Sequence, residues 1–211
     1  MVPMDALTAI FGTITKVKIL RLFLFNPEVS FFAPEIATRT QIPLATVKKE
    51  LAPMLKSDFL RKRLVTKEVP STRGPQYAPR KLRGFGYALN QKFPYLEPLK
   101  NLLTVSSISA DESLAKKFHA VGKLKLAVAA GVFIQNWDSR VDLLLVGDDF
   151  DLAKLEKVIK NIEAEIGKEL TYSAFETADF EYRLGIHDRL IRDILDYPHV
   201  TVLDRLGVDP R

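Results

Sequence analysis

Apolar positions recur at helical spacing near the start of the chain. In residues 14–25 they form one stripe, made of Ile14, Val17, Leu20 and Phe23. Residues 31–40 and residues 41–55 continue the helical pattern. Each has a proline at or near its start, Pro34 and Pro43, where a missing backbone N–H costs little. The three segments predict one helix followed by a helix-turn-helix.

The pattern then changes to that of strands. Residues 59–69 mix apolar with basic side chains, and residues 84–90 form a second run after a loop rich in proline and glycine. A strand, a basic loop and a strand behind a helix-turn-helix predict a wing. Residues 92–105 return to helical spacing, with a stripe of Leu96, Leu99, Leu102 and Leu103. This stripe either buries against a second copy of the chain, which we favour, or packs on its own domain.

The second half alternates strands with helices. We expect strands at residues 123–135, 140–147, 168–175 and 199–204, a helix at residues 151–167, and helical segments within residues 177–196. Asp151 is well placed to cap the long helix. The residues of that helix expected to point inward are Leu152, Leu155, Ile159, Ile162 and Ile166. The order of elements predicts a small mixed α/β unit.

The predicted fold class is therefore α/β (α+β), with domains at residues 1–104 and residues 112–211 joined by a short polar linker at residues 105–111. Charge separates the same halves. Residues 1–104 hold 17 Lys and Arg against 7 Asp and Glu, a balance of +10, whereas residues 105–211 hold 14 against 19, a balance of −5. Uneven surface charge is the simpler explanation, but the asymmetry favours a polyanionic partner for the first half.

Several classes of protein are disfavoured by what the sequence lacks. It has no cysteine, which excludes disulfides and thiolate metal sites. We see no signal peptide and no apolar run of the roughly 20 residues that a membrane helix needs. The three histidines have no metal-ligand spacing. We therefore expect a cytoplasmic protein that has no membrane segment, no metal and no cofactor.

A resemblance emerges from residues 11–27 and residues 31–63, "FGTITKVKILRLFLFNP" and "FFAPEIATRTQIPLATVKKELAPMLKSDFLRKR". The two stretches resemble the winged-helix domain of small bacterial and archaeal transcriptional regulators. The resemblance implies that the third helix enters the major groove of double-stranded DNA and that the protein forms a homodimer. Val47 and Leu51 would then face inward. The DNA-facing side would carry Ala45, Thr46, Lys48 and Lys49, although lysines on a solvated face are the alternative.

In the same family the wing touches the DNA backbone beside the groove. The predicted wing is strongly basic, because residues 61–83 contain eight Lys and Arg and a single acid, Glu68. We expect DNA contacts from this region, while a merely solvated loop is the alternative. The residues assigned to these contacts are Arg61, Arg63, Arg73, Arg80, Lys81 and Arg83.

Two residues depart from the family pattern. Pro53 falls inside the expected third helix, where it removes a hydrogen bond to residue 49, so we expect that helix to kink or stop near Ala52. Asp58 occupies a turn where relatives usually have glycine. Because aspartate tolerates a left-handed conformation better than most residues, we expect the turn to survive.

The second half resembles the minimal nucleotidyltransferase domain over residues 112–208. In active members a Gly-Ser pair ends the first strand, and an Asp-x-Asp on the second strand holds metal ions. Here Gly131 and Val132 occupy the Gly-Ser position, and Arg140 and Asp142 occupy the Asp-x-Asp position. An arginine at this place would repel Mg²⁺ and could instead pair with Asp142. The resemblance therefore implies a vestigial site without catalytic residues.

Together these observations predict a DNA-binding transcriptional regulator with a nucleotidyltransferase-like sensor or interaction domain that is not an enzyme. That second domain would meet a small molecule or a protein partner. Two alternatives stay open at this point. The chain could be an active nucleotidyltransferase, or it could be the antitoxin-like partner of a toxin.

Overall fold

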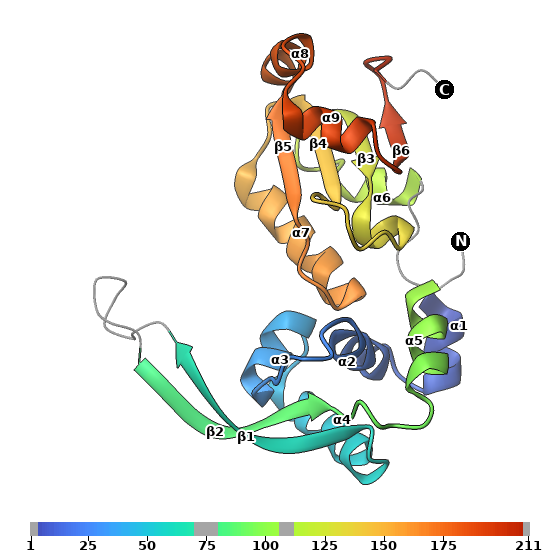
Figure 1. Ribbon diagram of the computed structural model, residues 1–211, viewed down its shortest axis with the longest axis vertical. Helices are drawn as coiled ribbons and strands as arrows, with labels where there is room; N and C mark the ends of the chain where they lie inside the picture. Colours follow the sequence, from blue (N-terminus) through green and yellow to red (C-terminus); the bar gives the residue numbers. More distant parts are fainter. Residues whose placement is uncertain (1–3, 70–79, 106–111, 209–211) are drawn as a thin grey trace. The chain divides into compact units, whose positions relative to one another are not determined.

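The computed structural model describes residues 4–69, 80–105 and 112–208, and the chain divides into two compact units, residues 3–103 and residues 104–211. The first unit combines helices with a β-hairpin, and the second combines a mixed four-stranded sheet with helices (Figure 1). The chain is thus a mixed α/β protein, as the hydrophobic pattern predicted. Within the described residues, no helix has the length and apolar character to cross a bilayer.

The helices of the first unit are α1 (Met4–Phe11), α2 (Ile14–Phe25), α3 (Ala33–Thr40), α4 (Leu44–Lys56) and α5 (Leu96–Val105). Local chemistry fixes where they start. The hydroxyl of Thr13 accepts from the backbone N–H of Lys16 at 3.1 Å and so caps α2. The carboxylate of Glu35 accepts from the backbone N–H of Phe32 at 2.7 Å and so satisfies a donor at the start of α3. Helix α1 was not predicted from the apolar spacing.

The core of the first unit joins these helices to the hairpin. Its fully buried members include Val17, Phe23, Ile36, Val47, Leu51 and Leu60. Val47 and Leu51 point inward, as predicted from their spacing on α4. Arg21 is also buried, and its Nε donates to the carbonyl of Leu103 at 3.3 Å, which ties α2 to the last turn of α5.

The leucine stripe of α5 packs mainly on its own unit. Leu103 is fully buried in the core, and Leu96 and Leu99 are half-buried against it, while Leu102 is 45% exposed. This is the arrangement that we considered less favoured than burial against a second copy. The homodimer stays a prediction, but three of the four leucines already pack against the core of their own unit.

Helix α4 runs through Pro53 to Lys56, so the alternative that it stops near Ala52 is wrong. Pro53 and Lys49 are both exposed. The carbonyl of Lys49 loses its helical hydrogen bond, because Pro53 has no N–H to donate. Water can satisfy that carbonyl, because the position lies on the solvent side of the helix. The helix continues to Lys56, and Asp58 then takes a left-handed conformation with φ of 60°. The prediction that the turn survives with aspartate at this position is confirmed.

The hairpin pairs β1 (Leu60–Val69) with β2 (Arg80–Leu89) in antiparallel register, from Leu60 opposite Leu89 to Val69 opposite Arg80. Strand β2 begins four residues earlier than predicted. Its free edge bonds to the segment before α3, where the backbones of Phe31 and Tyr87 exchange hydrogen bonds of 2.9 and 2.8 Å. The hairpin is therefore anchored to the helical part at its base.

The second unit is built on a sheet with strand order β5-β4-β3-β6. Its strands are β3 (Lys123–Ala129), β4 (Leu143–Asp148), β5 (Tyr172–Glu176) and β6 (Val200–Asp204). Its helices are α6 (Glu112–Lys117), α7 (Leu152–Ile166), α8 (Thr177–Gly185) and α9 (Arg189–Leu195), with a short 3-10 turn, η1 (Gly131–Ile134). Strands β4 and β5 are parallel, as their connection through α7 requires, and the other pairs are antiparallel.

Strand β4 is the apolar centre of this unit, since its residues 143–147 are all buried. Phe180 of α8 and Ile191 of α9 pack on alternate strand residues such as Leu144 and Val146. Asp151 caps α7 by accepting from the N–H of Lys154 at 3.1 Å, as predicted.

Two details of the second unit differ from the prediction. Leu152, expected to point inward, is 72% exposed, because the inward stripe of α7 begins only at Leu155. The strand expected over residues 123–135 ends at Ala129, and the chain then turns through η1. The turn starts at Gly131, whose φ is +51° and where an added Cβ would lie 2.1 Å from Oδ1 of Asp142. No other residue fits that position without a rearrangement.

Candidate functional site

Helix α4 presents the first group of candidate residues. Ala45, Lys48 and Lys49 are exposed and Thr46 is half-buried, so the face opposite the buried stripe carries the side chains predicted to meet DNA. No side chain caps the first turn, since residue 43 is proline, and the backbone N–H groups there remain available to an anion. The small side chain of Ala45 leaves room for a phosphate to approach them.

The hairpin presents the second group. Lys62, Arg63, Lys81 and Arg83 are exposed, and no ion pair involves any of them or either lysine of the α4 face within the part of the chain that the structure describes. Arg73 lies outside the described residues, and so does the side chain of Arg80, although its backbone begins β2. The hairpin therefore holds several cations that form no ion pair among the described residues, although Glu68 lies opposite Lys81 in the strand register.

Two other cations of the hairpin, Lys67 and Arg61, form ion pairs within the first unit. The first is Lys67. Its Nζ lies 2.9 Å from Oε2 of Glu35, the same oxygen that accepts from the N–H of Phe32. The ammonium also lies 5.3 Å from the ring centroid of Phe31 and 5.7 Å from that of Phe32. One carboxylate thus serves both the start of α3 and the middle of the hairpin, and it fixes the two elements together.

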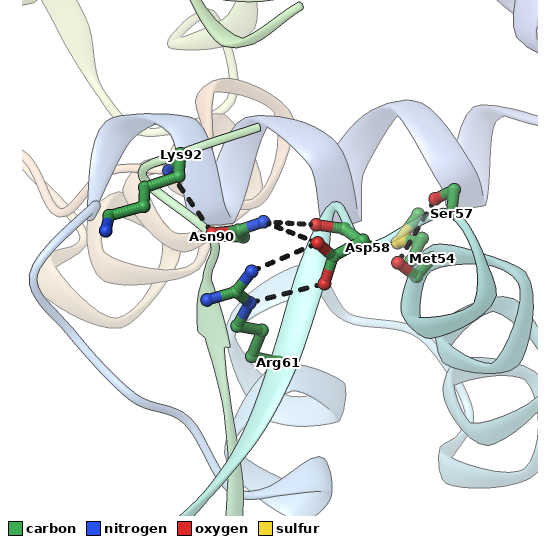
Figure 2. Close-up of polar contacts among 6 residues, drawn as sticks. All are labelled: Met54, Ser57, Asp58, Arg61, Asn90 and Lys92. Atoms are coloured by element: carbon green, nitrogen blue, oxygen red, sulfur yellow. Dashed lines mark hydrogen bonds and ion pairs between the residues drawn. The ribbon is translucent and has the colours of Figure 1, made fainter. Parts of the chain in front are cut away.

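Arg61 is the second engaged cation. Figure 2 shows its guanidinium facing the carboxylate of Asp58, with Nε 3.2 Å from Oδ1 and Nη2 3.1 Å from Oδ2. This paired hydrogen bond holds the pKa of Asp58 below its usual value and raises the pKa of Arg61 above its own. Arg61 was predicted to contact DNA, but its charge is already paired at the base of the hairpin.

Asn90 completes a latch around the same carboxylate. It is buried, and its Nδ2 donates to the carbonyl of Asp58 at 2.8 Å and to Oδ2 at 3.1 Å (Figure 2). Its Oδ1 accepts from the N–H of Lys92 at 3.2 Å. The turn after α4 is therefore bonded both to β1 and to the chain that leaves β2. We call Asp58, Arg61 and Asn90 the hairpin latch.

In the second unit the predicted site centres on Asp142, which is 4% exposed. Its Oδ1 accepts from the backbone N–H of Val132 and its Oδ2 from that of Thr171, both at 2.9 Å. The ammonium of Lys168 lies 3.9 Å from Oδ1. Both carboxylate oxygens are thus used to bind the turn after β3 to the segment before β5. The structure brings Asp142 beside Gly131 and Val132.

Arg140 does not pair with Asp142, so that expectation is wrong. Its Nη1 lies 2.8 Å from Oδ2 of Asp193 on α9, and its side chain is largely exposed. Both residues also precede β4, which begins at Leu143, so they do not share a face of a regular strand as the Asp-x-Asp comparison assumed. A recess of about 280 Å³ beside Arg140 is lined by Asn136, Asp138, Ser139, Arg140, Arg189, Asp193 and Tyr197.

These positions hold no set of metal ligands. Across residues 4–69, 80–105 and 112–208, no three His, Cys, Asp or Glu side chains come together in a way that could hold an ion. Backbone donors already bind both carboxylate oxygens of Asp142. Chemically, it acts as an anionic staple for two loops.

A second recess of the same unit, about 700 Å³ in volume, lies where α6 meets the start of β3 and β6. Its floor is apolar, with Ala115, Leu124 and Val202, and its rim carries His119, Lys123 and Arg205. That volume is in the usual range for small-molecule sites. The hydrophobic pattern gave no sign of this recess, because its walls come from elements that are distant in sequence.

Comparisons of the chain with models of protein families, with curated proteins and with solved structures found no match.

Proposed function

We propose that the chain is a DNA-binding transcriptional regulator in which the first unit is a winged helix that docks on duplex DNA. The observation that carries the proposal is the set of exposed cations without an ion pair in the described part of the chain: Lys48 and Lys49 on α4 and Lys62, Arg63, Lys81 and Arg83 on the hairpin. A globular unit gains nothing in folding from cations kept apart from acids. A polyanion, in contrast, gains affinity from each of them through release of counterions.

The arrangement of the first unit supports this role. Helix α4 has exposed lysines and an uncapped first turn, and that turn contains a small residue, Ala45. These are the features that allow a helix to approach phosphates and base edges closely. In the proposal, Arg61 positions the hairpin through Asp58 instead of contacting DNA. Arg73 and Arg80 remain predicted contacts whose side chains lie outside the described residues.

The proposed function is tested by the salt dependence of binding. The full chain should bind duplex DNA with an affinity that falls steeply as salt rises, and Lys48→Ala with Lys49→Ala should flatten the log–log slope by up to about 2. Lys154→Ala with Lys160→Ala removes the same charge from α7 and is the matched control. Equal flattening by this control, or absence of duplex binding by the unmodified chain, would falsify the assignment.

Neighbouring arginines of β1 give a second test. Arg63 is exposed without an ion pair among the described residues, whereas Arg61 is held by Asp58. We expect Arg63→Ala to weaken DNA binding with little change in melting temperature. Arg61→Ala should instead lower the melting temperature. Identical behaviour of the two variants in both assays would contradict the division of roles.

For the second unit we propose a non-catalytic sensor or interaction role. The engaged oxygens of Asp142 support it, because a metal-dependent transfer needs free carboxylates. The recess between α6, β3 and β6 supports a small molecule as one class of partner. Nucleotide transfer by the unmodified protein that Asp142→Asn abolishes, with the fold intact by circular dichroism, would restore the reading as an active nucleotidyltransferase.

A further inference from the structure

We propose that Phe85 and Leu64 form an apolar wedge with which the hairpin opens a base step of duplex DNA. The inference rests on the proposed function, since it specifies how the hairpin meets the duplex. The two residues lie directly opposite each other on β2 and β1, so their side chains share one face of the hairpin. They are 70% and 54% exposed, which is unusual for a cross-strand apolar pair.

The side chains around the pair indicate what covers it. By the strand register, the same face carries Lys62, Thr66, Lys81 and Arg83, with Glu68 as its acid. A purely apolar partner would leave the cations unmatched. A DNA duplex matches both features, because it offers phosphates on either side of a groove and apolar sugar and base surfaces within it.

The opposite face of the hairpin fixes the position of the wedge. Glycines flank Phe85, and an added Cβ would lie 3.3 Å from the ring of Phe32 at Gly84 and 3.3 Å from the carbonyl oxygen of Phe31 at Gly86. The strand therefore packs closely on the segment before α3, to which Tyr87 is also bonded. Figure 1 shows β1 and β2 extending beyond α3, so a duplex can reach the outer part of the hairpin.

A wedge on a rigid strand has a definite effect on DNA. Apolar side chains that enter a base step unstack it and bend the duplex, and flexible steps such as TA and CA/TG yield most easily. The gain comes from contact between an aromatic ring and the opened bases, which involves no phosphate. The wedge should therefore raise affinity and bending without changing the dependence of binding on salt.

The test compares the full chain with its Phe85→Ala variant on an end-labelled duplex of about 30 base pairs, rich in TA steps and carrying 2-aminopurine at one of them. We expect the variant to bind about tenfold more weakly or worse, since aromatic stacking on a base contributes that much. The slope of affinity against salt should stay the same. Resonance energy transfer between the duplex ends and 2-aminopurine fluorescence should both report less bending and unstacking. Leu64→Ala should cause a smaller loss of the same kind.

Tyr182→Ala, which removes an exposed aromatic ring from α8, is the matched control and should change none of these readings. Unchanged melting temperatures would show that the variants fold. If the unmodified chain binds DNA and depends on Lys48 and Lys49, but Phe85→Ala binds and bends it equally, the wedge is overturned while the proposed function stands. If Phe85→Ala instead converts a dimer to a monomer in sedimentation without DNA, a second copy covers the pair, and the wedge is again overturned.

Discussion

The two units use their charged residues in opposite ways. On α4 and the hairpin of the first unit, six lysines and arginines are exposed and form no ion pair among the described residues: Lys48, Lys49, Lys62, Arg63, Lys81 and Arg83. In the second unit, Asp142 and Arg140 both have partners within the unit. Asp142 is bound by the N–H groups of Val132 and Thr171, and Arg140 is bound by Asp193.

The difference shows that residue type alone does not identify a site. Asp142 has the type and sequence neighbourhood of a metal ligand, yet its bonding is that of a structural group. Lys48 is an ordinary surface residue by type, yet its exposure and lack of an ion pair leave it available to an anion. Variants that separate stability from binding test this contrast directly.

The largest expected effect on stability is that of Asp142→Ala. The change leaves the buried N–H of Val132 without an acceptor, at a cost of about 1–3 kcal/mol, and it breaks the part-buried bond from the N–H of Thr171, so the free energy of unfolding should fall by about 3 kcal/mol. Chemical denaturation of the full chain measures this. Asp138→Ala removes the same charge from an exposed position of the neighbouring loop and should change the value by less than about 0.5 kcal/mol. A small effect of Asp142→Ala would show that its hydrogen bonds contribute little to stability. It would also remove the difference in the role of charge that we draw between the two units.

A moderate effect is expected at Glu35. Glu35→Ala removes the acceptor for the N–H of Phe32 and the partner of Lys67, and should lower the free energy of unfolding by about 1 kcal/mol. Glu35→Gln keeps an oxygen for the helix N–H but loses the charge facing Lys67, so it should cost less. Equal losses from the two variants would indicate that the ion pair, not the helix cap, carries the contribution.

A smaller effect concerns the pH dependence of the hairpin latch. The hydrogen bond from Arg61 lowers the pKa of Asp58 in the folded state. The charged form therefore stabilises the fold above the unfolded-state pKa of about 3.9, and that contribution is lost as pH falls through the lower folded-state value. In the Asp58→Asn variant the side chain still tolerates the left-handed turn, but it has no carboxyl group to titrate.

The measurement is the melting temperature of both proteins from pH 6 down to about pH 2. The unmodified chain should be the more stable of the two at pH 6, and the two curves should converge as the pH falls below about 4. Other acids contribute equally to both proteins and cancel in the difference. A constant gap between the curves would mean that the charge of Asp58 does not support the turn.

The smallest effect on stability is expected where the effect on DNA binding is largest. Lys62→Ala, Arg63→Ala, Lys81→Ala and Arg83→Ala together should change the free energy of unfolding by less than about 0.5 kcal/mol in total, because exposed side chains without ion pairs contribute little. The same variant should lose most duplex affinity at physiological salt. A large fall in melting temperature would show instead that these side chains hold the hairpin together.

Much of the fold was readable from the sequence because the helices and strands keep regular apolar spacing. The buried stripe of Val47 and Leu51, the cap at Asp151 and the alternation of strands and helices in the second half all follow from local chemistry. The errors have tertiary causes. Pro53 is tolerated because its face of α4 is exposed, and the strand after Lys123 ends early because Asp142 binds the turn at Val132.

The site was less predictable because ion pairs depend on which side chains lie close together in the folded chain, and sequence spacing does not show this. Lys67 and Arg61 look like any other cation of the hairpin, and only the structure brings Glu35 and Asp58 to them. The exposure of Phe85 was hidden for a similar reason. A strand residue at such a position is buried or exposed according to what covers its face, and the G-F-G sequence was the available signal that one face is tightly packed and the other open.

The attachment of Lys67 to Glu35 has a mechanical consequence. Ten-residue strands make the hairpin an arm of about 33 Å. The arm is clamped at its base by the latch, and further out by a carboxylate that belongs to α3. It cannot swing by itself, so a force applied to it is passed to the helices instead of being absorbed by bending. A duplex that docks on such an arm has to supply the deformation, and stiff sequences would then be rejected before any base edge is read.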